Sequence, residues 1–187
     1  MIGRLLAAAL LLLGTAGPVG ARASNDAAPA DVASAKLAWL GHVTRFVTWP
    51  EASFDAPEAA FRLCVLGHDP FGERLHALQE QRVAGRPIQI EHPQTLEGLA
   101  RCQLAYFGSG ADAGLLRAAQ DGRLPTLLGI SSDPEFARRG GMLALVGEGA
   151  DIHLHVNLGS VHASRLDFSA KLLELAQVRH TATTRDR

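Results

Sequence analysis

The residues most able to do chemistry form an alternating segment near the C-terminus, Asp151-Ile-His-Leu-His-Val-Asn157. Strict alternation places its polar side chains on one face of a strand, namely Asp151, His153, His155 and Asn157. Two His residues two positions apart on a strand can bind a metal, and a nearby carboxylate strengthens that pattern. The same alternation is typical of a half-buried strand, and the chain contains 8 His residues in total. We therefore expect no metal site, and we treat His153, His155 and Asn157 as candidate partner-binding residues.

A second candidate is the pair of arginines followed by two glycines in Arg138-Arg-Gly-Gly-Met142. The glycines allow tight backbone geometry, and the guanidinium groups beside them can bind an anion or the carboxylates of a protein partner. The alternative is a solvated helix end, where a glycine caps the helix and cations interact favourably with its C-terminus. We expect Arg138 and Arg139 to contribute to partner binding.

Two glycine-rich segments match nucleotide-binding loops in part of their spacing only. Gly67-His-Asp-Pro-Phe-Gly72 has the glycine spacing of a phosphate loop, but Glu73 and Arg74 follow where Lys and Ser or Thr are needed. Gly108-Ser-Gly-Ala-Asp-Ala-Gly114 is longer than the dinucleotide fingerprint, and Asp112 adds a negative charge in the first turn of the following helix. We expect an ordinary strand-to-helix turn with Asp112 in the cap region, and no nucleotide or other cofactor.

The 2 cysteines of the chain are Cys64 and Cys102. Cys64 lies within a short apolar run and Cys102 just before another, and both runs are predicted strands. If these strands are neighbours in a parallel sheet, the thiols come within bonding reach, and in an exported chain a disulfide is expected. Two separate buried thiols are the alternative, because a free Cys packs as a small apolar residue.

Residues 1–23 have the three parts of a secretory signal peptide. Arg4 supplies the positive start, residues 5–13 are an unbroken run of Leu and Ala, and Ala21-Arg-Ala23 is a signal peptidase site. The apolar run is too short to span a bilayer, which takes about 20 residues. We therefore expect cleavage after Ala23, a location in the periplasm and no direct insertion into the membrane.

Length and composition favour a single globular domain. The 187-residue chain has a formal net charge of −1 and 5% aromatic residues, so it has neither the basic charge nor the stacking groups of a nucleic-acid-binding protein. It lacks a Gly-x-Ser-x-Gly elbow and a His-Glu-x-x-His motif, and we expect no catalytic residues and no enzymatic activity. The domain is expected to cover residues 31–178, followed by a flexible tail over residues 179–187.

Short apolar runs alternate with helical patterns along this domain. The runs predict strands over residues 62–66, 87–91, 104–107 and 125–130. The helical patterns cover residues 31–47, 71–79, 96–101, 112–120, 133–138 and 169–178. Two further runs, residues 142–146 and 151–158, flank a Gly-rich turn that is typical of an antiparallel hairpin. We expect a three-layer α/β domain, with a mostly parallel central sheet, helices on its faces and a C-terminal antiparallel hairpin.

The order and spacing of several short segments resemble the YfiR-like family of bacterial periplasmic proteins. The segments together span residues 33–178 and are Phe46-Val-Thr-Trp-Pro50, Leu63-Cys-Val-Leu-Gly67, Asp69-Pro-Phe-Gly72, the Cys102 region, Phe136-Ala-Arg-Arg-Gly-Gly-Met142, Val156-Asn-Leu158 and Ser169-Ala-Lys-Leu-Leu173. The resemblance implies a repressor that binds the periplasmic part of an inner-membrane diguanylate cyclase and keeps the cyclase inactive. It also implies the disulfide between Cys64 and Cys102, whereas a second disulfide of some relatives has no counterpart here.

Two hypotheses for function follow. The first is a regulator without enzymatic activity that binds the cyclase through Arg138, Arg139, His153, His155 and Asn157. A homodimer would suit a regulator of a dimeric cyclase. The second is a small-molecule-binding module, because parallel sheets bind ligands beyond the carboxyl ends of their strands. The ligand site would then be formed by the turns after Leu66, Phe107 and Ile130.

Overall fold

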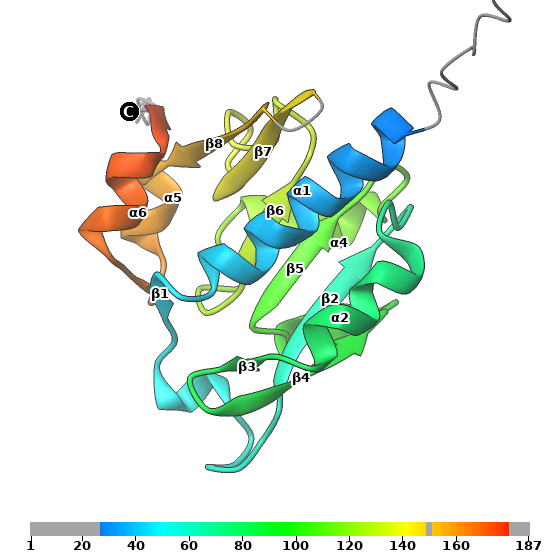
Figure 1. The fold of residues 1–187 in the computed structure, drawn as a ribbon. Coiled ribbons are helices and arrows are strands. Elements are labelled where there is room, and N and C mark those ends of the chain that lie inside the picture. Colours follow the sequence, from blue (N-terminus) through cyan, green and yellow to red (C-terminus); the bar gives the residue numbers. More distant parts are fainter. Residues whose placement is uncertain (1–26, 149–150, 180–187) are drawn as a thin grey trace, which may run out of the picture.

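The computed structural model describes residues 27–148 and 151–179, in which a central sheet of eight strands dominates the fold (Figure 1). The strands follow one another across the sheet in the order β10-β8-β7-β6-β5-β2-β4-β3. Their bounds are β2 Phe61–Leu66, β3 Arg82–Val83, β4 Arg86–Glu91, β5 Leu104–Phe107, β6 Leu128–Ser131, β7 Leu143–Glu148, β8 Asp151–Asn157 and β10 Gln177–Arg179.

The centre of the sheet is parallel, as predicted. Strand β2 pairs in parallel with β4 on one side and with β5 on the other, and β6 and β7 continue the parallel order. Strands β7 and β8 form the predicted antiparallel hairpin, with Leu145 opposite Leu154. Every described residue of β5 and β6 is buried, because helices cover both faces of the sheet.

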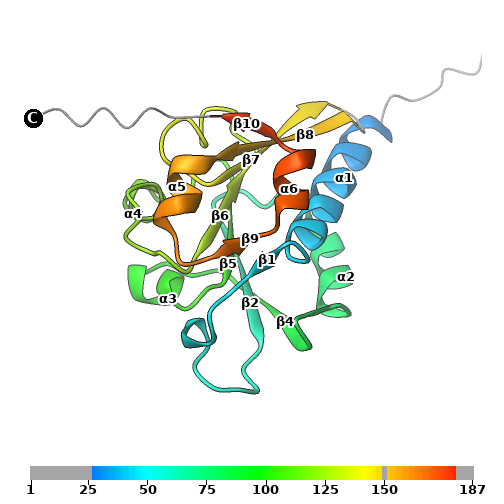
Figure 2. The ribbon, with the colours of Figure 1, turned by 90° about the vertical axis from the view of Figure 1, so that its left-hand side faces the viewer.

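Helices on the two faces make the expected three layers, and Figure 2 shows the sheet between them. Helix α1 (Ala27–Val43), the 3-10 helix η2 (Gly72–Leu75) and α2 (His76–Gln79) pack on one face, where Leu40 and Leu78 meet the strand residues Leu63 and Tyr106. Helices α3 (Leu96–Ala100) and α4 (Ala113–Gln120) pack on the other face, against Phe107. Alternate residues of β2 and β5 therefore belong to different cores.

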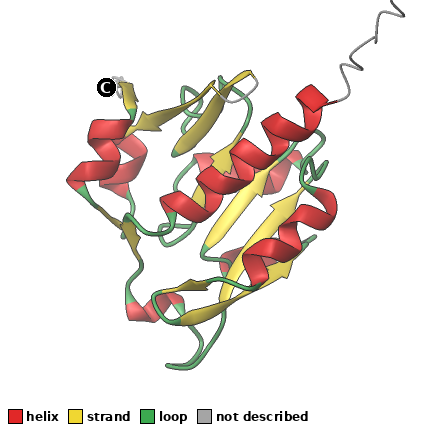
Figure 3. Ribbon diagram, viewed as in Figure 1, coloured by secondary structure: helices red, strands yellow, loops and turns green. Residues whose placement is uncertain are grey.

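Helix α1 lies four positions earlier than the predicted residues 31–47, and Asp31 is not its N-cap. The helix ends at Val43 because the chain then turns tightly: the amides of Arg45 and Phe46 donate to the carbonyls of His42 and Val43, at 3.1 and 3.0 Å. Val47 and Thr48 instead form strand β1, which pairs with β9 (Asp167–Phe168) in a separate antiparallel ribbon (Figure 3). The apolar pattern in the sequence extends beyond the end of the helix because Val47, although part of β1, packs into the same core.

The C-terminal part also differs from the prediction. A helix was expected over residues 169–178, but α6 covers Ala170–Leu175 and is followed by strand β10, which pairs in parallel with β8. Helix α5 (Leu158–Ala163) was not predicted, and residues 133–138 form turns rather than a helix. The short strand β3, which pairs antiparallel with β4, was not predicted either.

Two of the sequence predictions concern the ends of the chain. The predicted signal peptide, residues 1–23, and most of the predicted tail lie outside the described residues. Among the helices that are described, none combines the length and the apolar character that crossing a membrane requires.

Candidate functional site

The predicted disulfide is present between Cys64 of β2 and Cys102, which lies two residues before β5. The two Cα atoms are 6.0 Å apart, and both side chains are buried. Their neighbours are Leu66, Leu99 and Phe107 in the core beneath α3 and α4. The bond therefore ties the end of α3 to strand β2, and neither cysteine of the chain is a free thiol.

A crevice opens at the carboxyl ends of β2, β5 and β6. From β2 the chain crosses to β4 over one face of the sheet, through α2, and it reaches β6 from β5 over the opposite face, through α4. The chain therefore leaves β2 and β5 toward opposite faces of the sheet, which is the arrangement that leaves ligand crevices in open α/β sheets. The crevice has a volume of about 790 Å³ and is bordered by the turns after Leu66, Phe107 and Ile130, where the sequence placed its alternative ligand site.

Glycines allow the two loops below this crevice to approach each other closely. The amide of His68 donates to the carbonyl of Ser109 at 2.7 Å. A Cβ atom on Gly108 would lie 1.9 Å from the carbonyl oxygen of His68, and Gly67 has a φ of +74°. The glycines of the two segments are therefore needed for backbone packing between these loops.

The inner wall of the crevice is built from hydroxyl groups. The Tyr106 hydroxyl and Ser132 Oγ are 2.7 Å apart, and Ser131 Oγ donates to the carbonyl of Phe107 at 2.7 Å. Burial raises the pKa of Tyr106, the charge of Asp69 raises it further, and the hydrogen bond with Ser132 partly opposes the shift. Tyr106 is therefore a neutral phenol that can donate or accept a hydrogen bond at the crevice wall.

Cationic side chains from both helical layers border the crevice. Lys36 comes from α1 and Arg117 from α4, and neither has an ion-pair partner among the described side chains. Arg139 also lines the crevice and is ion-paired with Asp133. Burial lowers the pKa of Lys36, because a half-buried ammonium group loses hydration.

The Arg-Gly segment (residues 138–142) separates this crevice from a second cavity of about 390 Å³. Arg139 lines the crevice and Arg138 lines the second cavity. Both side chains are exposed, and Arg138 is ion-paired with Glu135 at 2.9 Å. The two predicted arginines therefore lie on one ridge and point to hollows on either side of it.

The glycines of the Arg-Gly segment are required by close contacts. Gly140 has a φ of +99°, and a Cβ there would lie 2.6 Å from the carbonyl oxygen of Gln120. A Cβ on Gly141 would lie 2.3 Å from the ring of Phe136, which is buried. The ridge is thus held tightly against α4 and against the core below it.

The alternation places Asn157 on the polar face of β8, but its side chain is buried rather than exposed. Its side chain is 2% exposed, its Nδ2 donates to the carbonyl of Ala137 at 2.8 Å, and its Oδ1 accepts from the amide of Ser160 at 3.2 Å. The alternation of β8 stops here because Asn157 caps helix α5. Asn157 supports the Arg-Gly segment from beneath instead of forming part of the surface.

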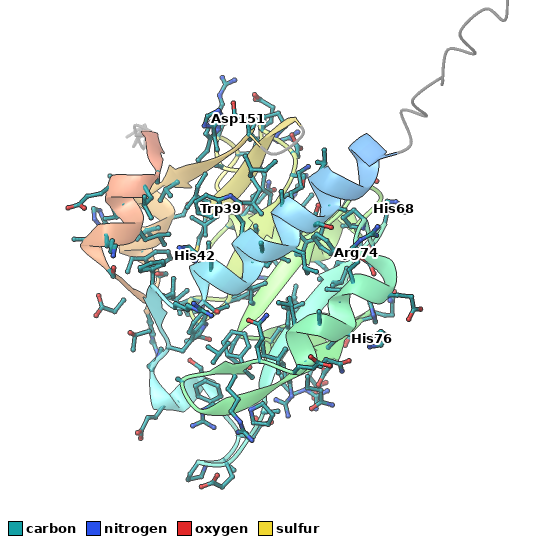
Figure 4. All side chains as sticks on the ribbon, viewed as in Figure 1. Trp39, His42, His68, Arg74, His76 and Asp151 are labelled. Carbon is teal, nitrogen blue, oxygen red and sulfur yellow. A yellow bond between two sulfur atoms is a disulfide. The ribbon has the colours of Figure 1, made fainter. Side chains whose placement is uncertain are left out.

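The two His candidates lie along the same strand, away from the Arg-Gly segment. His153 is exposed, and its Nε2 is 3.4 Å from Oδ2 of Asp151. Asp151, labelled in Figure 4, begins β8. His155 is half-buried. His153 and Asn157 are four strand positions apart, which corresponds to about 13 Å. The structure therefore separates the predicted contact residues into a ridge at one end of β8 and a His-Asp pair toward the other.

Across residues 27–148 and 151–179, no group of His, Cys, Asp and Glu side chains is arranged to hold a metal ion. The sequence reasoning missed Lys36, Tyr106 and Arg117 at the crevice. Lys36 and Arg117 come from helices on opposite faces of the sheet, and no local motif marks them.

A comparison with protein-family models identifies a matching family. The family model described as YfiR/HmsC-like matches residues 33–177, which is most of the chain. Among curated proteins, no significant match is found.

Proposed function

The chain belongs to the YfiR/HmsC-like family, and from this premise we propose that it binds the periplasmic sensor domain of a membrane diguanylate cyclase and represses the cyclase. The family match is the observation that carries the proposal, since it covers residues 33–177 and supports a general role in regulating diguanylate cyclase signalling. The family is regulatory and periplasmic. Repression of a particular cyclase is the further step that we propose.

A periplasmic location is supported by two features of the chain. Residues 1–23 have the pattern of a secretory signal peptide, and Cys64 and Cys102 form a disulfide, a bond that is typical of oxidising compartments. The periplasm is also where the sensor domain of an inner-membrane cyclase would be accessible.

We place the main contact surface on the Arg-Gly segment. Arg138 and Arg139 project from a ridge with a cavity on each side, so a partner surface with acidic side chains could pair with both guanidinium groups and enter the hollows. The ion pairs with Glu135 and Asp133 are on exposed side chains, and such pairs contribute little to stability. Exchanging them for carboxylates of a partner therefore has a low cost.

Repression requires that the chain bind the inactive state of the cyclase more tightly than the active state. A binder shifts such an equilibrium only by the difference between these two affinities. The disulfide and the glycine contacts at the ridge support a rigid binding surface, which loses little conformational entropy on association. His153 and His155 are proposed as a second, peripheral contact.

The proposal is tested by capture from membranes. The tagged, disulfide-bonded chain is incubated with detergent-solubilised inner membranes of the source bacterium, and captured proteins are identified by mass spectrometry. We expect a diguanylate cyclase to be captured by the wild-type chain and lost with Arg138→Glu/Arg139→Glu. The matched control is Arg74→Glu/Arg101→Glu, which makes the same charge change at exposed positions elsewhere. Capture of no cyclase by the wild type, or equal capture by the ridge variant, contradicts the proposal.

A further inference from the structure

We propose that the crevice at the carboxyl edge of the sheet binds a small organic anion with an acidic group at each end, held between Lys36 of α1 and Arg117 of α4. This inference does not depend on the cyclase. It assigns a ligand class to the crevice that borders the proposed partner surface.

The shape of the crevice suits a small molecule. Its volume of about 790 Å³ lies in the range of ligand sites, roughly 300–1,000 Å³. Phe107 and Phe136 supply apolar surface, while Tyr106 and Ser132 supply hydroxyl groups. Small-molecule sites are usually partly apolar pockets with a few polar groups that point into them.

The charges that border the crevice are mainly positive. Lys36, Arg117 and Arg139 are opposed among the lining residues by Asp133, whose carboxylate is paired with Arg139. Nearby, a carboxylate oxygen of Asp69 accepts a hydrogen bond from the amide of Phe71 at 2.7 Å. An anion that enters the crevice therefore meets two cations, Lys36 and Arg117, that have no ion-pair partner among the described residues.

Lys36 is the more informative of the two cations. It is half-buried, so its ammonium group has lost part of its hydration, and burial lowers its pKa. Among the described side chains no carboxylate lies within ion-pair distance of it. Losing hydration without gaining an ion pair costs free energy, and Lys36 borders a cavity. We infer that a bound ligand supplies the compensating negative charge.

The positions of the two helices explain why the ligand needs two acidic groups. Helix α1 covers one face of the sheet and α4 the other, as Figure 2 shows. Lys36 and Arg117 therefore reach the crevice from opposite layers. A ligand with an acidic group at each end can pair with both cations by extending across the edge of the sheet. His68, labelled in Figure 4 just beyond the end of β2, borders the same opening.

The proposal is tested by calorimetric titration of the purified, disulfide-bonded chain with defined probes. The two-ended anions are succinate, citrate and 3-phosphoglycerate, and the controls are inorganic phosphate, acetate and the uncharged analogue succinamide. We expect saturable binding of at least one two-ended anion, with inorganic phosphate and acetate at least about tenfold weaker and succinamide inactive. A preference for 3-phosphoglycerate indicates a phosphorylated ligand, and a preference for succinate or citrate indicates a polycarboxylate.

Variants assign the binding to the crevice. Lys36→Met and Arg117→Met keep apolar stems, and each should weaken the preferred anion at least about tenfold. Arg101→Met, at an exposed position just before β5 and so at the opposite edge of the sheet, should leave its affinity unchanged. Circular dichroism confirms that each variant is folded. Absence of saturable binding for all three two-ended anions overturns the proposal. It is also overturned if inorganic phosphate binds as tightly as they do, or if folded Lys36→Met and Arg117→Met bind like the wild type.

Discussion

Single side chains decide what each surface of this molecule can do. Asn157 continues the polar alternation of β8 in the sequence, yet it is buried and joins the carbonyl of Ala137 to the first turn of α5. His153, four residues earlier on the same strand, is exposed beside Asp151. The alternation correctly predicted which residues face away from the hydrophobic core, but it could not predict that the next helix covers one end of that face.

Lys36 gives a prediction for stability at the residue scale. Burial lowers its pKa below the ordinary value of 10.5, so the charged form costs stability at neutral pH. Because the native side chain releases its proton before the unfolded one does, this cost disappears as the pH rises through the native pKa toward 10.5. Lys36→Met should therefore be as stable as the wild type at pH 7, or more stable by less than about 1 kcal/mol, and the difference should shrink at pH 10.

Urea unfolding at the two pH values measures this difference. Lys171→Met is the matched control, because Lys171 is exposed on α6. If Lys36→Met is clearly less stable than the wild type at pH 7, then burial of the charged Lys36 side chain does not lower the free energy of unfolding.

At the scale of elements, burial decides how well the sequence predicts the structure. Strand β5 has the predicted bounds because it is a continuous apolar run that is buried on both faces. Asp112 caps α4 as expected, accepting from the amides of Gly114 and Leu115. Strand β10 was missed because its residues continue a helical pattern, and only pairing with β8 makes them extended. Strands of two residues, such as β1 and β9, carry no detectable periodicity.

The Arg-Gly segment gives a prediction at this scale. Gly140→Ala must accommodate both a positive φ and a Cβ that meets the carbonyl of Gln120, whereas Gly122→Ala has a φ of +70° with nothing within 4 Å of its Cβ. We expect Gly122→Ala to lose about 1 kcal/mol of unfolding free energy and Gly140→Ala to lose at least about 1 kcal/mol more. Urea midpoints compare the two variants, and equal midpoints would show that the ridge is not held against α4.

At the scale of the whole molecule, strand order creates the crevice and places the ridge beside it. The sequence predicted a parallel α/β sheet and the turns that border the crevice, because the carboxyl ends of parallel strands lie at one edge. It could not predict that Lys36 and Arg117 border the same hollow, since that depends on how two helical layers are oriented across the sheet. The separation of the ridge from the His-Asp pair likewise depends on tertiary packing.

The disulfide is expected to stabilise the fold as a whole, because it closes a loop between residues 38 positions apart. Restricting the unfolded chain in this way contributes roughly 2–4 kcal/mol. Cys64→Ala/Cys102→Ala should lower the unfolding free energy by about that amount, measured by urea denaturation beside the oxidised wild type. An unchanged midpoint would contradict a stabilising role for the bond.

The central claim is that this chain represses a diguanylate cyclase through its arginine ridge. The most direct measurement is the cyclic di-GMP content of the source bacterium with the chain deleted, restored as wild type, or restored as Arg138→Glu/Arg139→Glu. We expect deletion to raise cyclic di-GMP, the wild type to return it to the original level, and the variant, exported in equal amount, to leave it raised. Unchanged cyclic di-GMP after deletion, or full repression by the variant, would contradict the claim.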